Sequence, residues 1–69
     1  MNVGQLYWFV SKAAEAWDPA MTAQEKAWLV RACGRAYRCG ASIMTAWDLS
    51  VRELAFRRRK TGKPVTRAL

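Results

Sequence analysis

Thr22–Gly40, TAQEKAWLVRACGRAYRCG, carries the pattern of an amphipathic helix with both of its ends marked. Thr22 and Glu25 have the spacing of a capping box, in which each side chain accepts a hydrogen bond from the backbone amide of the other residue. Gly40 suits the position just past the last turn, because glycine adopts the left-handed conformation without steric cost. We therefore predict that a helix begins after Thr22 and stops at Gly40.

The apolar residues of this predicted helix gather on one side of it. On a wheel of about 100° per residue they lie within roughly 140° of one another. They are Leu29, Ala32, Cys33, Ala36 and Tyr37. Arg31, Arg35 and Arg38 point the other way. The segments on both sides carry apolar stripes that need a partner, so we expect both to pack against this helix.

The segment Val3–Trp17 also has the pattern of an amphipathic helix. Its apolar residues recur at spacings of three and four, and we expect this stripe to be buried. The stripe consists of Val3, Leu6, Val10, Ala13 and Trp17, with Tyr7 and Ala14 beside them. Asp18-Pro19 ends the helix, because the residue before a proline is disfavoured in the α conformation. The short connection Asp18–Met21 then predicts an antiparallel hairpin of the two helices.

The segment Ala41–Thr61 allows two interpretations. As one helix, it buries a stripe of Ile43, Ala46, Trp47, Ser50 and Leu54. As two helices, it breaks near Asp48–Ser50, where Ser50 and Glu53 would form a second capping box. Both interpretations stay open, and Thr61-Gly62-Lys63-Pro64 ends the segment in either case.

These segments predict an all-α fold, a helical hairpin followed by a third helical segment. We expect residues 1–61 to form a single small helical domain and residues 62–69 to form a frayed basic tail. A chain of 69 residues is close to the size at which one core is barely sufficient. We therefore expect a homodimer that supplies additional buried surface.

A metal site or a disulfide is not expected to provide this stabilisation. The chain has no histidine and only two cysteines, Cys33 and Cys39, which lack a second pair of metal ligands. Six positions apart on a helix, the two thiols lie about 120° apart around its axis, which disfavours a disulfide. We expect two reduced, packing cysteines and no cofactor.

The N-terminal sequence MNVGQLYWFVSK lacks the positively charged start of a signal peptide. No apolar run approaches the roughly 18 residues that cross a bilayer. We therefore expect a soluble protein of the cytoplasm.

The positive charge is concentrated near the C-terminus. Of the net charge of +7, residues 52–69 hold seven basic side chains against one carboxylate, an excess of six. Residues 1–51 hold five basic and four acidic side chains, an excess of one. A polyanion or an acidic protein surface is the natural partner of such an arm.

The residues form no catalytic pattern. The usual general base is missing because histidine is absent, and no carboxylates are paired at a spacing that suits acid–base chemistry. The serines have no nearby base of the kind that activates a nucleophile. We expect no enzymatic activity and no small-molecule substrate.

Aromatic and arginine residues, most of them outside the buried stripes, are the candidates for a protein-binding surface, because such residues dominate interface hot spots. Trp8 lies on the charged face of the first helix, so it is either a dimer contact or an anchor for another protein. Phe56 faces away from Leu54 in the third segment. The full candidate set is Trp8, Phe9, Arg31, Arg35, Tyr37, Arg38 and Phe56.

The two-helix interpretation of Ala41–Thr61 suggests an alternative, a helix-turn-helix DNA-binding regulator. Leu49-Ser50-Val51 resembles the turn that enters a recognition helix, although Asp48 and Met44 depart from the usual glycine and small residue. The residues suited to phosphates or guanine edges are Arg52, Arg57, Arg58, Arg59 and Lys60. A plain solvated basic helix end is the competing interpretation, since the helix dipole favours it. A membrane-surface role is disfavoured by the nearly neutral body of the chain.

In its length, its all-helical basic makeup and its abundance of alanine, arginine and tryptophan, the whole chain resembles the anti-quorum-sensing proteins of Mu-like Pseudomonas phages. The resemblance implies a non-enzymatic, dimeric inhibitor of host regulatory proteins. Its implied targets are the DNA-binding region of the quorum-sensing activator LasR, whose promoter binding is blocked, and the pilus assembly ATPase PilB. The basic charge argues against a DNA mimic, which would be acidic.

Overall fold

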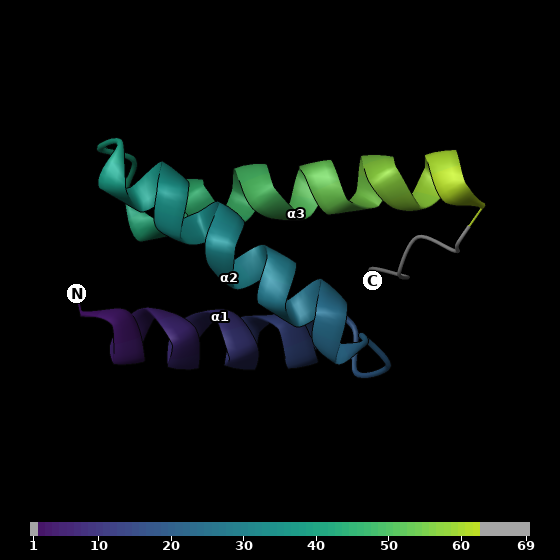
Figure 1. Cartoon of the computed structure of the whole chain (residues 1–69), viewed down its shortest axis with the longest axis horizontal. Helices are drawn as coiled ribbons and strands as arrows, with labels where there is room; N and C mark the ends of the chain where they lie inside the picture. The colour runs from purple at the N-terminus through teal and green to yellow at the C-terminus, as the bar shows by residue number, and fades with distance from the viewer. Residues whose placement is uncertain (1, 63–69) are drawn as a thin grey trace.

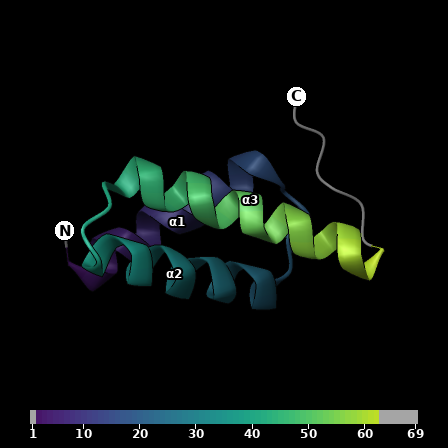
Figure 2. The same cartoon turned by 90° about the horizontal axis from the view of Figure 1, so that it is seen from above.

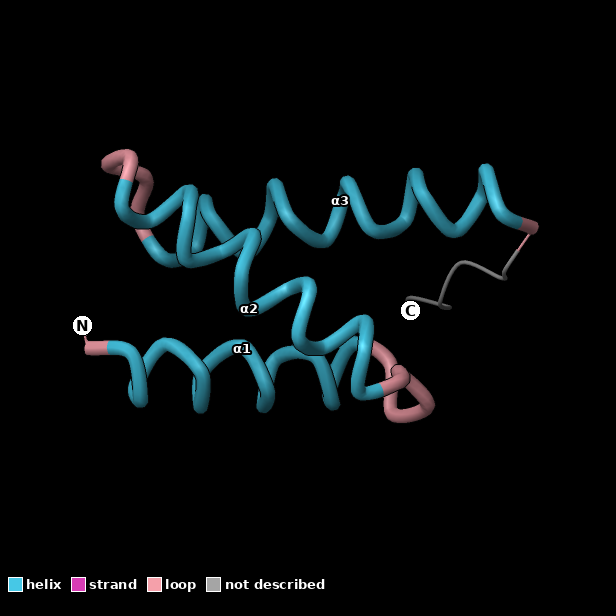
Figure 3. Tube along the Cα trace, viewed as in Figure 1, coloured by secondary structure: helices cyan, strands magenta, loops and turns pink. Residues whose placement is uncertain are grey.

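The computed structural model describes residues 2–62, which form three α-helices joined by short connections (Figure 1, Figure 3). They are α1 (Val3–Trp17), α2 (Ala23–Arg38) and α3 (Ile43–Thr61). In Figure 1, α2 crosses between α1 and α3 and runs opposite to both. Figure 2 shows α2 displaced to one side of the other two helices, so the three do not lie in one layer. The predicted all-α fold is confirmed, and α2 is the element against which both neighbours pack.

Polar caps set the starts of α1 and α2. The Glu25 amide donates to Thr22 Oγ1 over 3.1 Å and the Thr22 amide donates to Glu25 Oε1 over 3.3 Å, as the capping-box pattern predicts. Asn2 and Gln5 form an equivalent box at the start of α1, which the sequence analysis did not identify. Gly40 adopts a φ of +107° after α2, as the predicted stop requires.

The core lies between α2 and its two neighbours. Its buried apolar side chains are Leu6, Val10, Ala14, Met21, Leu29, Cys33, Ala46 and Leu54. The Cys33 thiol donates to the Ala46 carbonyl oxygen over 3.8 Å, and burial raises the pKa of this thiol above its ordinary value. Cys33 therefore packs as predicted, whereas Cys39 is exposed just past α2 and does not.

Two residues predicted to be buried in α1 are exposed instead. Val3 is 79% exposed and Tyr7 is 57% exposed. The buried residues of α1 are Leu6, Val10 and Ala14, at a spacing of four, so the packed stripe starts at Leu6 and includes neither Val3 nor Tyr7. The apolar stripe was correct in its middle, at Leu6 and Val10, and wrong at its N-terminal end.

α3 is one unbroken helix, so the one-helix interpretation is confirmed and the predicted break near Asp48–Ser50 is wrong. Ala46, Ser50 and Leu54 are all buried at a spacing of four, and burying this stripe requires the helix to continue through position 50. Ser50 is 4% exposed and does not cap a helix, so the second capping box does not form.

Gly62 ends α3 in the left-handed conformation, with a φ of +83°. The rest of the predicted basic tail, residues 63–69, lies outside the described residues. None of the helices in residues 2–62 is long and apolar enough to cross a membrane.

Candidate functional site

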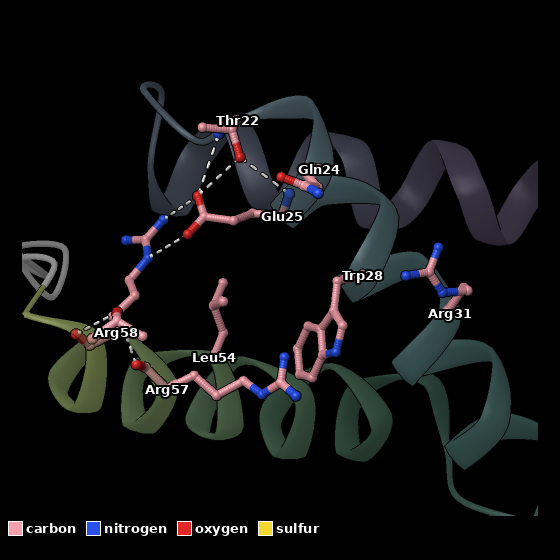
Figure 4. A pocket seen from close by; sticks show the side chains of 9 residues that line it. Thr22, Gln24, Glu25, Trp28, Arg31, Leu54, Arg57 and Arg58 are labelled. Carbon is pink, nitrogen blue, oxygen red and sulfur yellow. Dashed lines mark hydrogen bonds and ion pairs between the residues drawn. The ribbon is translucent and has the colours of Figure 1, made fainter.

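A groove between α2 and α3 brings together residues from both halves of the chain (Figure 4). Trp28 extends from α2 toward α3, Arg57 extends along α3 toward it, and Leu54 lies between the two helices (Figure 4). The Arg57 guanidinium lies 5.0 Å from the centre of the Trp28 ring, a cation–π contact that holds both side chains in place. Arg31 of α2 lines the same groove.

Two further hollows are lined by residues of α3. One is lined by Arg35 and Cys39 near the end of α2 and by Leu49 and Glu53 of α3. The other lies along the outer side of α3 and is also lined by Glu53. We define the α2–α3 face by eight of the residues that line these three hollows: Trp28, Arg31, Arg35, Leu49, Glu53, Phe56, Arg57 and Lys60.

The cations of the α2–α3 face are not neutralised by the rest of the described structure. Among residues 2–62, the carboxylates pair with Lys26, Arg52 and Arg58. The cations of the face have no carboxylate partner among these residues; they are Arg31, Arg35, Arg57 and Lys60. The result is a surface rich in positive charge on which hydrogen-bond donors alternate with aromatic and aliphatic side chains.

Aromatic and aliphatic side chains on the face are held beside its cations. Lys60 Nζ lies 5.4 Å from the centre of the Phe56 ring, a second cation–π contact. Phe56 is 53% exposed and Leu49 is 52% exposed, on the same side of α3. Glu53 lies between them in the sequence and makes no ion pair within residues 2–62.

Arg58, a member of the candidate DNA-binding set, is not on this surface. It is 5% exposed, and its guanidinium donates to both oxygens of Glu25, over 3.1 Å from Nε and 2.9 Å from Nη2. Its Nη2 also donates to Asp18 Oδ2 over 2.7 Å, and the guanidinium lies 5.2 Å from the centre of the Trp17 ring. Hydrogen bonding to Glu25 raises the pKa of the guanidinium, although burial acts in the opposite direction.

This ion cluster has a structural role. Asp18 caps the end of α1, Glu25 lies in the first turn of α2, and Arg58 lies in the last turn of α3, so the guanidinium joins one end of each helix. Arg58 is therefore not available to contact DNA as the alternative prediction required. The signal that could have revealed it is the spacing of four, since Arg58 continues the buried stripe of Ser50 and Leu54.

The remaining candidates of the DNA-binding set are divided. Arg57 and Lys60 belong to the α2–α3 face, whereas Arg52 and Arg59 do not line its hollows. Arg52 pairs with Asp48 over 3.2 Å in an exposed contact one helical turn away.

The protein-binding candidates are also divided. Arg31, Arg35 and Phe56 belong to the α2–α3 face, which therefore joins members of both predicted sets. Trp8, 62% exposed, and the half-buried Phe9 line a separate apolar hollow with Asn2, Gly4 and Gln5, at the start of α1. Tyr37 is half-buried and Arg38 is exposed near the end of α2, and neither lines the α2–α3 hollows.

Three members of the face were not among the candidate site residues: Trp28, Leu49 and Glu53. Trp28 lies on the border of the apolar stripe of α2. Whether a residue at such a border is buried or exposed depends on where the neighbouring helix crosses, which the sequence does not give. Leu49 had been assigned to the helix-turn-helix turn, which α3 does not contain.

Among the described residues, no group of three or more histidine, cysteine, aspartate or glutamate side chains could hold a metal ion. Comparison with known proteins gives no match: no family model, no curated protein and no solved structure is similar to the chain.

Proposed function

We propose that this protein is a non-enzymatic inhibitor that binds a regulatory protein of its host through the α2–α3 face. The observation that carries the proposal is that the cations of this face have no carboxylate partner within residues 2–62 and share the face with Trp28, Leu49 and Phe56. These cations are Arg31, Arg35, Arg57 and Lys60. Arginine and aromatic side chains that share a surface are the typical composition of interface hot spots.

The targets that the resemblance implies are the first to consider. They are the DNA-binding region of LasR, where binding would prevent promoter recognition, and PilB. A positively charged face would hold an acidic part of the target, so it would inhibit by covering or reorienting the DNA-binding surface and not by imitating DNA. These targets place the action of the protein in the host cytoplasm.

The alternative of a helix-turn-helix regulator has less support. The turn that it requires near Ser50 lies inside the continuous helix α3, and Arg58 is buried against two carboxylates. We keep nucleic acid as an outcome of the experiment below and not as a second proposal.

We further propose that the protein acts as a homodimer joined through the outer side of α1. This helix exposes Tyr7 and Trp8, 57% and 62% respectively, and carries one cation and one carboxylate, Lys12 and Glu15. Two copies can therefore meet along α1 while their α2–α3 faces stay apart. Contact between the two α2–α3 faces would be opposed by their like charges. In this arrangement Trp8 is a dimer contact, and both α2–α3 faces point outward.

The test is affinity capture from a nuclease-treated Pseudomonas lysate, with two charge-reversed variants of equal net charge. The first variant, Arg31→Glu with Arg57→Glu, changes the α2–α3 groove. The matched control, Arg38→Glu with Arg59→Glu, changes exposed arginines that do not line it. We expect the native protein and the control to retain a host regulatory protein and the first variant to lose it.

Circular dichroism of both variants verifies that each remains helical. Material that is captured from an untreated lysate but not from the nuclease-treated one would replace the proposal with nucleic-acid binding. Equal loss of capture in the two variants would show that net charge and not the α2–α3 face is responsible, and would refute the site.

A further inference from the structure

We infer that the α2–α3 face receives an amphipathic α-helix of the partner protein, with carboxylates on both edges of its apolar stripe. This inference rests on the proposed function above, because it specifies what kind of partner segment the face accepts. A groove between two antiparallel helices is the space that a further helix fills in a four-helix bundle. α1 already covers one side of α2, and the α2–α3 face is the side that residues 2–62 leave uncovered.

The apolar residues of the face have the spacing that a helix can match. Leu49 and Phe56 are seven positions apart on α3, so they lie on one side of it and about 10 Å apart along its axis. Trp28 of α2 lines the groove beside Arg57, whereas Leu49 and Phe56 line the two further hollows of the face. The face spans residues 49–60 of α3, a length of about 17 Å that corresponds to roughly three turns of a bound helix.

The charged residues of the face lie on both edges of the groove. Arg31 and Arg35 are one turn apart on α2, whereas Arg57 and Lys60 lie on α3. A bound helix would thus meet cations on each side of its apolar stripe. Carboxylates at those positions would form charge-assisted hydrogen bonds with the arginines, which recognise planar oxygen pairs.

A second copy of this chain does not fit the face. α1 carries one carboxylate beside one lysine, and the Glu25 carboxylate of α2 is held by Arg58 of its own chain. The sequence after Gly62, KPVTRAL, adds Lys63 and Arg67 and no acidic side chain. Self-association through the α2–α3 face would therefore bring arginines against arginines.

Glu53 argues for a protein helix over a nucleic acid. Its exposed carboxylate lines two of the three hollows and makes no ion pair within residues 2–62. A phosphodiester backbone that followed the cations would meet this negative charge in the middle of its path. A protein helix avoids the repulsion by placing a lysine or arginine opposite Glu53.

The experiment measures binding of three fluorescent probes to the full-length protein by anisotropy at about 150 mM salt. The first probe is a synthetic peptide of about 16 residues with a leucine stripe at helical spacing, glutamates on both edges of the stripe and one central lysine. The second has the same composition in scrambled order. The third is a single-stranded oligothymidylate of equal negative charge. We expect the amphipathic peptide to bind at least about tenfold more tightly than either of the others.

Variants then locate the bound peptide. Arg31→Glu with Arg57→Glu is expected to weaken peptide binding by about tenfold or more, whereas the control Arg38→Glu with Arg59→Glu changes it less than about threefold. Arg35→Glu with Lys60→Glu provides a second pair on the same face if the first is poorly folded. Glu53→Gln is expected to weaken binding of the lysine-bearing peptide and to strengthen binding of the oligonucleotide.

The contrary outcomes are distinct. Tighter binding of oligothymidylate than of the peptide would make nucleic acid the occupant, and equal binding of the scrambled peptide would reduce the face to an unspecific cationic surface. A dimer, detected by sedimentation, that weakens with Arg31→Ala and Arg57→Ala would make a second copy the occupant. Capture of a host protein that depends on the face, without peptide binding, would refute this inference and leave the proposed function standing. Absence of both host-protein capture and peptide binding would refute this inference and the proposed function.

Discussion

At the scale of single residues, the most informative side chain is Arg58. It is a charged group with almost no exposure, and it donates hydrogen bonds to carboxylates 33 and 40 residues away in the sequence. A buried ion pair adds little net stability compared with a well-packed apolar group, but removal of one partner leaves an uncompensated charge. The guanidinium also lies over the Trp17 ring, so truncation removes a cation–π contact as well as the ion pairs.

We predict that Arg58→Ala lowers the free energy of unfolding by about 3 kcal/mol, because Asp18 and Glu25 would remain partly buried without their shared cation. The control is Arg52→Ala, which removes an exposed pair with Asp48 and is expected to change stability by less than about 0.5 kcal/mol. Urea unfolding followed by circular dichroism measures both values. Similar midpoints for the two variants would contradict the structural role of Arg58.

The raised pKa of Arg58 also predicts how this contribution depends on pH. A cation whose pKa is higher in the folded state than in the unfolded state stabilises the folded protein fully at pH values below its unfolded-state pKa. This stabilisation is lost only as the pH rises through the folded-state pKa. For a guanidinium this lies far above neutrality. Titration of Arg58 itself therefore leaves the stability unchanged from acidic to moderately alkaline pH.

At the scale of elements, the ends and the interior of α2 show how local conformation decides the effect of a substitution. Gly34 lies inside the helix, and a Cβ added there would be 3.5 Å from Leu6 Cδ2, an ordinary van der Waals contact. The glycine is therefore not required for the approach of α1. Gly40 has a positive φ just past the helix end, a conformation in which an added side chain is strained even though the space is open.

The two glycines give a matched prediction of opposite sign. Gly34→Ala is expected to raise the free energy of unfolding by about 0.5–1 kcal/mol, because alanine favours the helix and loses less backbone freedom on folding. Gly40→Ala is expected to lower it by about 1 kcal/mol, because the left-handed conformation becomes costly. Thermal unfolding of the two variants checks the signs. A destabilised Gly34→Ala would mean that α1 and α2 approach more closely than the contact at Leu6 indicates.

At the scale of the whole molecule, the positively charged α2–α3 face and the nearly neutral outer side of α1 lie on different sides. The cations of the α2–α3 face, which have no carboxylate partner within residues 2–62, lie on two helices, whereas the outer side of α1 is nearly neutral and exposes Trp8. This separation is what allows one side to be proposed for self-association and the other for an acidic partner. It also predicts opposite responses to salt, since screening weakens the contact with a charged partner and reduces repulsion between two copies.

We predict that Trp8→Ala weakens dimerisation by about tenfold or more, since buried tryptophan contacts are frequent hot spots. The control is Met44→Ala, which truncates a side chain of similar exposure, 63%, on α3. Sedimentation equilibrium at two salt concentrations gives the association constants, and the native dimer is expected to tighten as salt increases. If Met44→Ala weakened dimerisation and Trp8→Ala did not, the dimer interface would lie on α3 and not on α1.

The features that the sequence by itself determined are those encoded within one or two helical turns. The capping box of Thr22 and Glu25, the stop at Gly40 and the apolar stripe of α2 follow from local hydrogen bonds and from the period of the helix. The start of α1 was encoded in the same way, at Asn2 and Gln5, although it was not recognised. Each of these patterns involves residues close enough in the chain to interact whatever the rest of the fold does.

Only the tertiary structure decided what depends on the angle at which α2 crosses its neighbours. The packing of α2 against both helices leaves Val3 and Tyr7 exposed and buries Ser50 within a continuous α3. The same packing gives neighbouring arginines different roles. It places Arg58 beside Asp18 and Glu25 and leaves Arg57 in the groove with Trp28. The physical reason is that a side chain's surroundings are set by segments tens of residues away, whose relative placement is settled by packing the whole core at once.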